Sequence, residues 1–246
     1  MEIITSRANN AIKNAKKLQQ KKYRKTSYLI EGWHLFEEAV AANANIEKIF
    51  VIPEQADKVR DYPQAVQVTA ELLKDLAESP SPQGVVAVIA LPNQQMPEVL
   101  TGRFLVLEDV QDPGNVGTMI RTADAAGFDG VIVSEKTADI YNLKTLRSMQ
   151  GSHFHLPIYQ VDTAEALSRL KACQIPLVAT TLSEHSIDYR EVPKTANVAL
   201  IMGNEGQGIS DLVAQEADIL AHITMPGRAE SLNVAVATGI LLFHIV

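Results

Sequence analysis

Apolar residues along the chain follow two alternating spacings, one typical of helices and one typical of strands. From Ala8 to Leu18 they recur every three or four positions, which predicts a helix with one buried face. Short runs rich in β-branched residues, such as 48–52 and 85–91, favour strands. Because the two kinds of segment alternate to the C-terminus, the sequence predicts an α/β fold with a mainly parallel sheet.

The same pattern sets the expected position of each further element. Strands are expected at 28–30, 48–52, 66–68, 85–91, 104–108, 130–133, 177–180, 198–202 and 219–224. Helices are expected at 33–42, 70–78, 115–126, around 167–171, and at 211–216 and 231–246.

A change of character between residues 91 and 97 predicts a domain boundary. This stretch is polar and carries two prolines, which suits a linker. We therefore expect an N-terminal domain over 1–91, a linker over 92–100 and a C-terminal domain over 101–246. Two domains agree with the number expected for a chain of 246 residues.

The last predicted helix, 231–246, is apolar on nearly all sides. A helix of this kind must be buried, because no face of it suits water. Two interpretations remain open: the helix packs into the core of its own chain, or it packs at a subunit interface.

The formal net charge of −7 hides an uneven distribution. Residues 1–25 hold eight Lys or Arg and one acid, which gives +7, whereas the other 221 residues sum to −14. A positive segment on an acidic body is either a solvated helix face or a surface for a polyanion such as RNA.

Several classes of protein are excluded by absences in the sequence. The single cysteine, Cys173, rules out an internal disulfide, and the histidines show no metal-ligand spacing with it, so no metal is expected. Met1 leads into polar and basic residues rather than a signal peptide. The longest apolar stretch, 232–246, is shorter than the ~20 residues that span a bilayer. These features predict a cytoplasmic protein.

The segment 111–123 is the first that carries candidate chemistry. It follows a predicted buried strand and opens a helix, which is where ligands bind in parallel α/β sheets. Asn115 is a good helix N-cap residue, and Gly114 and Gly117 allow close approach of the backbone. Arg121, near the second turn, is either a surface arginine or a functional one.

The segment 200–210 is the second that carries candidate chemistry. After the end of a predicted strand it contains three glycines and the carboxylate of Glu205. It is either a tight turn or a loop that orients a ligand. It contains neither Gly-x-Gly-x-x-Gly nor Gly-Lys-Ser/Thr. The sequence therefore disfavours a nicotinamide-dependent oxidoreductase, a P-loop protein and an ordinary Rossmann-type methyltransferase.

The segment 223–234 is the third. Pro226–Gly227 predicts a turn, and Ser231 is expected to cap the last helix. Asn233 inside that apolar helix is costly unless it is hydrogen-bonded. A purely structural turn and cap remains an alternative.

Together, and in this order, the three segments resemble the SpoU/TrmH family of RNA ribose 2′-O-methyltransferases, part of the SPOUT class. Asn115 with Arg121 matches the first family motif, 203–206 the second, and Pro226 with 231–234 the third. The segments 139–144 and 147–157 are also similar to the family, although family members often have proline where Leu143 stands and serine near Met149. Residues 16–32 resemble the family's N-terminal substrate-binding domain, a small α/β module.

The resemblance implies a fold and an activity that periodicity does not show. The C-terminal α/β domain would contain a deep trefoil knot, which is close to absent among proteins in general. The enzyme would be a homodimer with the last helix at the interface. It would move a methyl group from S-adenosyl-L-methionine to a ribose 2′-hydroxyl of RNA.

The resemblance also implies roles for individual residues. Its expected cofactor contacts are Gly203, Ile223 and Leu232, with Thr180, Leu200, Met202 and Met225 as neighbours. The expected catalytic set is Arg121, Asn115, Glu205, Ser231 and Asn233. Arg121 would act as a general base or, since a guanidinium is a poor base, would bind the target phosphate and stabilise the alkoxide. The expected RNA contacts are Arg7, Lys16, Lys17, Lys21, Lys22, Arg24, Lys25 and Arg147.

The RNA target stays open at this point. The N-terminal domain favours large-subunit (23S) ribosomal RNA over transfer RNA, and a role in antibiotic resistance remains an alternative to a housekeeping role. A non-catalytic RNA-binding protein of the same fold is a further alternative, which the presence of Arg121, Glu205 and 231–233 argues against.

Overall fold

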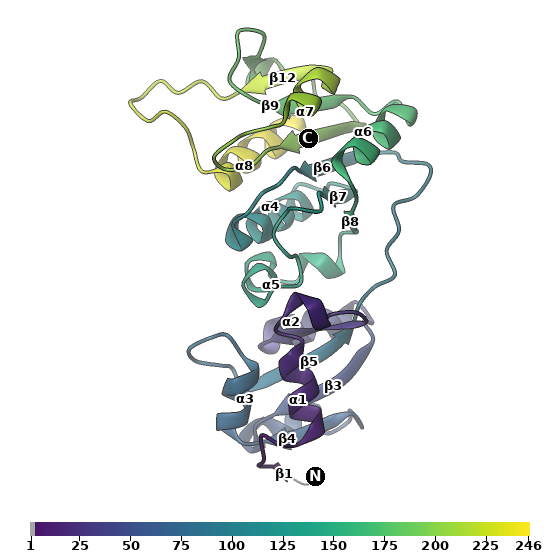
Figure 1. Cartoon of the computed structure of the whole chain (residues 1–246), viewed down its shortest axis with the longest axis vertical. Coiled ribbons are helices and arrows are strands. Elements are labelled where there is room, and N and C mark those ends of the chain that lie inside the picture. The colour runs from purple at the N-terminus through teal and green to yellow at the C-terminus, as the bar shows by residue number, and fades with distance from the viewer. Residues whose placement is uncertain (1–2) are drawn as a thin grey trace. The chain divides into compact units, whose positions relative to one another are not determined.

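The computed structural model describes residues 3–246 and divides into two compact units (Figure 1). The first unit holds the described residues up to Asn93 together with Asp139–Phe154. The second holds Gln94–Ala138 and His155–Val246. The sequence assigns 139–154 to the C-terminal domain, so this segment is the main difference between the expected division and the observed one.

The first unit is a five-stranded sheet of order β1-β4-β3-β5-β2. Its strands are β1 (Ile3–Ile4), β2 (Ser27–Glu31), β3 (Ile46–Val51), β4 (Ala65–Val68) and β5 (Val85–Ala90). The strand β5 is antiparallel to both of its neighbours, and the other pairs are parallel. Its α-helices are α1 (Asn10–Lys17), α2 (Trp33–Ala41), α3 (Ala70–Leu76) and α5 (Leu143–Met149). The sequence pattern missed β1, because two residues carry no periodicity.

The helix α1 separates the apolar and basic residues of the N-terminal segment. Ile12 and Ala15 are buried, whereas Lys13, Lys16 and Lys17 are exposed. The side chain of Asn9 caps the helix by accepting a hydrogen bond from the N–H of Ala11. Lys16 and Lys17 in the last turn suit the negative end of the helix dipole.

Ionic and aromatic contacts hold the segment 139–154 within the first unit. The guanidinium of Arg24 pairs with the carboxylate of Asp139, and the Arg24 side chain is only 5% exposed. The ring of Tyr141 lies 4.5 Å from that of Tyr28, centroid to centroid, and burial raises the pKa of Tyr141 to about 12. The Tyr28 hydroxyl lies 3.1 Å from Nε2 of His153. Because these groups are distant in sequence, hydrophobic periodicity could not predict their association.

The second unit is a seven-stranded sheet of order β10-β12-β9-β11-β6-β7-β8, with every pair parallel. Its strands are β6 (Arg103–Leu107), β7 (Gly130–Val133), β8 (Ile158–Gln160), β9 (Leu177–Thr180), β10 (Ile187–Asp188), β11 (Val198–Met202) and β12 (Ile219–His222). Its α-helices are α4 (Pro113–Ala125), α6 (Thr163–Ala172), α7 (Asp211–Glu216) and α8 (Val234–Ile245). The predicted α/β class with a mainly parallel sheet is therefore confirmed.

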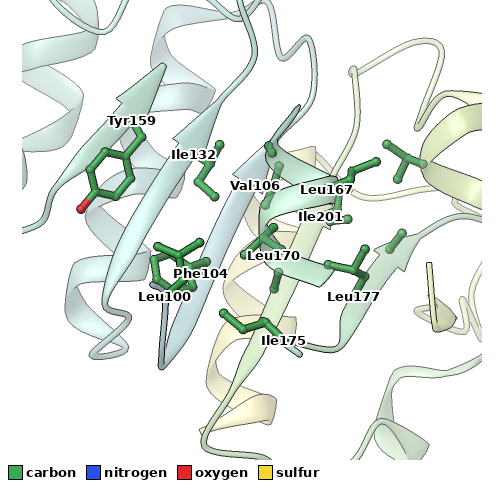
Figure 2. Packing of buried hydrophobic residues seen from close by; sticks show 14 of the residues in the cluster. Leu100, Phe104, Val106, Ile132, Tyr159, Leu167, Leu170, Ile175, Leu177 and Ile201 are labelled. Atoms are coloured by element: carbon green, nitrogen blue, oxygen red, sulfur yellow. The ribbon is translucent and has the colours of Figure 1, made fainter. Parts of the chain in front are cut away.

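Alternate residues of the central strands face the two sides of this sheet. Phe104 and Val106 pack with Leu167 and Leu170 of α6, as Figure 2 shows. Leu105, which is also fully buried, points to the opposite side because successive side chains of a strand alternate. On that side α4 packs on β6 and β7, and α8 packs on α4 and β11. Both helical layers are needed to bury strands that are apolar on both faces.

Two predicted helix caps are wrong by two or three residues. Asp112, not Asn115, caps α4, since its carboxylate accepts from the N–H of Asn115 and Pro113 takes the first helical position. Asn233, not Ser231, caps α8 and accepts from the N–H groups of the next turn. Asn115 and Asn233 both lie at the start of a helix. Each side-chain amide also has donor or acceptor atoms that the helix does not use.

Across residues 3–246, none of the helices has the length and apolarity needed to traverse a lipid bilayer.

We expect Asp139→Asn to destabilise the first unit by about 3 kcal/mol, because it leaves the nearly buried Arg24 charge without its counter-ion. Trp33, the single tryptophan, lies in this unit, so its fluorescence during urea unfolding measures the effect. The matched control is Arg7→Gln, which breaks an exposed ion pair and should change the midpoint little. A wild-type midpoint for Asp139→Asn would mean that the buried pair does not stabilise the unit.

Candidate functional site

A cavity of about 450 Å³ lies in the second unit, where β9, β11 and β12 end. It is lined by residues from 180–182, 202–208, 222–225 and 230–241. These segments follow parallel strands, so their backbone groups point away from the sheet towards a common edge. The position agrees with the rule that ligands bind at the carboxyl ends of the strands.

Six of the seven residues expected to contact a cofactor line this cavity. They are Thr180, Met202, Gly203, Ile223, Met225 and Leu232. Leu200 is the exception, because it lies in the middle of β11 and is fully buried in the sheet. The family resemblance counted Leu200 among the neighbours of the cofactor, although only the last residues of a strand reach the edge of a sheet.

Gly203 is required by the shape of the loop after β11. The chain folds back at once, with paired hydrogen bonds between Asn204 and Gly208. A Cβ atom on Gly203 would lie 2.2 Å from the carbonyl carbon of Gly208, a distance that real contacts do not reach. The chain can therefore fold back in this way beside the cavity only with glycine at this position.

The carboxylate of Glu205 joins this loop to the start of α4. It accepts hydrogen bonds from the N–H of Gln111 at 3.0 Å, the N–H of Asp112 at 2.9 Å and Nδ2 of Asn115 at 3.1 Å. Partial burial alone would raise the pKa of Glu205, but these hydrogen bonds outweigh it and lower the pKa. The group is therefore an anion that holds two of the three motifs together.

Asn115 connects Glu205 to the third motif through hydrogen bonds. Its Oδ1 accepts from Nδ2 of Asn233 at 3.0 Å, and Oδ1 of Asn233 in turn accepts from the N–H groups of Ala235 and Val236. A carboxylate can only accept and a helix N-terminus can only donate, so the direction of both amides is fixed. We call Glu205, Asn115 and Asn233 the amide relay.

A second set of polar contacts supports the loop that carries Gln111. The side-chain amide of Gln111 donates to the carbonyls of Asp109 at 3.1 Å and Lys136 at 2.6 Å. Nδ2 of Asn204 also donates to the carbonyl of Asp109, at 2.9 Å. Asp109 has a positive φ of 56°, which these contacts help to maintain. Neither Gln111 nor Asn204 was expected to have a role of its own, although Gln111 begins the first segment and Asn204 lies within the second motif.

The structure brings the remaining expected catalytic residues less closely together. Ser231 lines the cavity from the loop before α8. Arg121 lies on the exposed side of α4, nearly two turns beyond Asn115. Its guanidinium makes no hydrogen bond or ion pair with another residue in the described range 3–246. Arg121 is thus a cation available to a ligand, next to the amide relay in sequence.

The expected RNA contacts fall into two groups. Lys16, Lys17, Lys21, Lys22 and Lys25 are exposed on and after α1. The three arginines are instead engaged within the first unit, because nearby carboxylates pair with them. Arg7 pairs with Glu71 and Asp75, Arg24 with Asp139, and Arg147 with Glu31 and Glu78. The lysines therefore form the available basic surface, and Tyr23, which is 44% exposed among them, was not anticipated.

In the part of the chain that the structure describes, no three His, Cys, Asp or Glu side chains gather into a group that could hold a metal ion.

Known proteins resemble this chain over its whole length. Residues 102–243 match the SpoU rRNA Methylase family, and residues 9–87 match the MRM3-like substrate binding domain. A 23S rRNA (guanosine(2553)-2′-O)-methyltransferase, RlmP of Bacillus subtilis, is 39% identical over 100% of this chain and 99% of its own. A putative TrmH family tRNA/rRNA methyltransferase of Staphylococcus aureus is 30% identical over 88% of this chain and 94% of its own.

Solved structures agree with the sequence comparison. The AdoMet-bound rRNA methyltransferase from Sinorhizobium meliloti superposes with a TM-score of 0.89 at 34% identity, covering 99% of this chain and 97% of that one. The family match covers more than half of the chain and includes all three motifs, two of which line the cavity. The chain therefore belongs to the SpoU rRNA methylase family and is a methyltransferase that uses S-adenosylmethionine, as the sequence motifs predicted.

Proposed function

We propose that the enzyme methylates a ribose 2′-hydroxyl of 23S ribosomal RNA and works in the cytoplasm. The observation that carries the proposal is the amide relay, which joins the first motif to the two motifs that line the cavity. Full-length similarity to an enzyme named for 23S rRNA 2′-O-methylation supports the target. The match of residues 9–87 to a substrate-binding domain supports a large RNA substrate.

The cavity suits S-adenosylmethionine in its chemistry. Gly203, Asn204 and Gly208 bring the loop after β11 to the cavity wall, and Met202, Ile223 and Leu232 supply apolar surface for an adenine ring. The charged residues that line it are carboxylates, which suits a ligand with a net positive charge. When bound, the cofactor supplies an electrophilic methyl group on a sulfonium.

The amide relay would position the loops around the reacting groups. Attack of the 2′-oxygen on a methyl carbon gains mainly from orientation, so a rigid site is what the chemistry needs. Glu205 fixes the start of α4, and Asn233 fixes the start of α8. Ser231, on the cavity wall between them, would contact the cofactor or the target nucleotide.

Arg121 would bind the phosphate beside the target nucleotide and stabilise the 2′-oxygen as it attacks the methyl group and its proton passes to solvent. A guanidinium is a poor base, so Arg121 is suited to stabilise negative charge rather than to accept a proton. Its exposure, without an internal partner in residues 3–246, leaves its donors available.

The exposed lysines of the first unit would bind the RNA backbone. Phosphate contacts by lysine release counterions, so binding through this surface falls as salt rises. Tyr23 would offer a stacking surface among these charges.

We also propose a homodimer and a knotted C-terminal segment. The apolar side chains of Val236 and Phe243 on α8 are 53% and 55% exposed, which suits burial against a second copy. For the knot, β11 lies between β9 and β6, β12 then pairs on the other side of β9, and α8 returns to α4.

The direct test is methylation of protein-free 23S rRNA and of transfer RNA with radiolabelled S-adenosylmethionine, followed by mapping of 2′-O-methyl positions. We expect label at one ribose of 23S rRNA. Arg121→Ala should lower turnover about 100-fold or more, as removal of a transition-state donor does, with little change in cofactor affinity. Label in transfer RNA alone would favour the second target. Label on a base, or wild-type turnover by Arg121→Ala, would contradict the mechanism.

Replacing Lys16, Lys17, Lys21 and Lys22 with glutamine should weaken RNA binding and make it less dependent on salt. The slope of log affinity against log salt should fall in magnitude by about 3, or about 0.7–0.9 per lost contact. The matched control carries four glutamines at other exposed lysines, namely Lys58, Lys74, Lys171 and Lys194. Equal slopes for the two variants would show that the surface at α1 does not bind RNA.

A further inference from the structure

The Asp, Glu, Lys and Arg side chains that line the cavity are all acidic. Glu205 and Glu230 line it, whereas none of its lining residues is a lysine or arginine. The other titratable group in the lining is His222, whose ring lies between the hydroxyls of Ser186 and Thr224. A cationic ligand would therefore meet an excess of negative charge.

The two carboxylates differ in what they already bind. Glu205 accepts from two backbone N–H groups and from Asn115, so its charge is committed to holding the loops. Glu230 is exposed and makes no hydrogen bond or ion pair with any other residue between 3 and 246. It directly precedes Ser231 and Leu232, which line the same cavity. Its charge is thus free to act on a ligand.

No nearby cation cancels this charge inside the cavity. Arg228 is close in sequence but is not among the lining residues. Arg190 is held by two hydrogen bonds to the carboxylate of Asp188, at 2.6 and 3.0 Å. This contact and a hydrogen bond from Thr224 keep the pKa of Asp188 well below its usual range. Asp188 and Arg190 therefore offset one another outside the cavity.

We propose that Glu230 is a specificity-determining residue that makes the cavity prefer S-adenosylmethionine over its product, S-adenosylhomocysteine. Methyl transfer turns a positive sulfonium into a neutral thioether, so the ligand loses one unit of positive charge. A free carboxylate in the lining attracts the substrate form more than the product form. Glu230 thereby aids product release, and the inference rests on the proposal that this cavity is the cofactor site.

The test is the ratio of dissociation constants for the two ligands, measured by calorimetry at low salt on the full chain. In Glu230→Gln the preference for S-adenosylmethionine should fall about 1.5- to fivefold, the range typical of one exposed charge pair. Sinefungin, which carries an amine near the position of the sulfonium, should lose affinity as S-adenosylmethionine does. Glu230→Asp should keep most of the preference, and added salt should reduce it in the wild type.

The matched control is Glu98→Gln, which removes the same charge from an exposed site outside the cavity lining and should leave the ratio unchanged. An unchanged ratio in Glu230→Gln, or an equal loss for both ligands, would overturn the role of Glu230. If the wild type binds neither ligand, the proposed cofactor site itself is wrong and the inference falls with it. The titration of the wild type separates the two failures. Only a wrong cofactor site would abolish binding of both ligands to the wild type.

Discussion

The carboxylate of Glu205 accepts hydrogen bonds from the backbone at Gln111 and Asp112 and from the side chain of Asn115. Through Asn115 and Asn233 the same chain of contacts reaches the first turn of α8. One anion thus fixes the start of α4 against two segments that lie about a hundred residues further along the chain, directly at Glu205 and through Asn115 at Asn233. The shape of the cavity depends on this arrangement, since the loop at Gly203 and the loop before α8 form its walls.

Charge is divided between the two units in a way that matches the two ligands. The exposed lysines on and after α1 belong to the first unit, whereas the cavity with Glu205 and Glu230 belongs to the second. A polyanion and a cationic cofactor need opposite surroundings, and the net charge of −7 conceals both. The distribution of charge is therefore more informative about function than its sum.

Local patterns predicted most elements and the approximate position of the site, because apolar periodicity and motif order are properties of short segments. They failed where distant groups decide the structure. Asn115 was expected as a cap, and Asn233 as a residue that is costly unless it is hydrogen-bonded. No local pattern identified the partners that orient them, which lie about a hundred residues away. Likewise Arg24 was expected on RNA, yet it is buried against Asp139. Leu200 was expected at the cofactor but lies within the sheet, since position along a strand decides access.

The most direct test of the amide relay is the activity of Asn115→Asp relative to the wild type as pH falls. The new carboxylate would face Glu205, and two adjacent carboxylates raise the pKa of one of them. Below that raised pKa the shared proton restores a donor, so relative activity should be low at neutral pH and should recover in acid. Asn115→Ala has no such proton, so the ratio of its activity to that of the wild type should not recover as pH falls. A flat ratio or wild-type activity for Asn115→Asp would contradict the account.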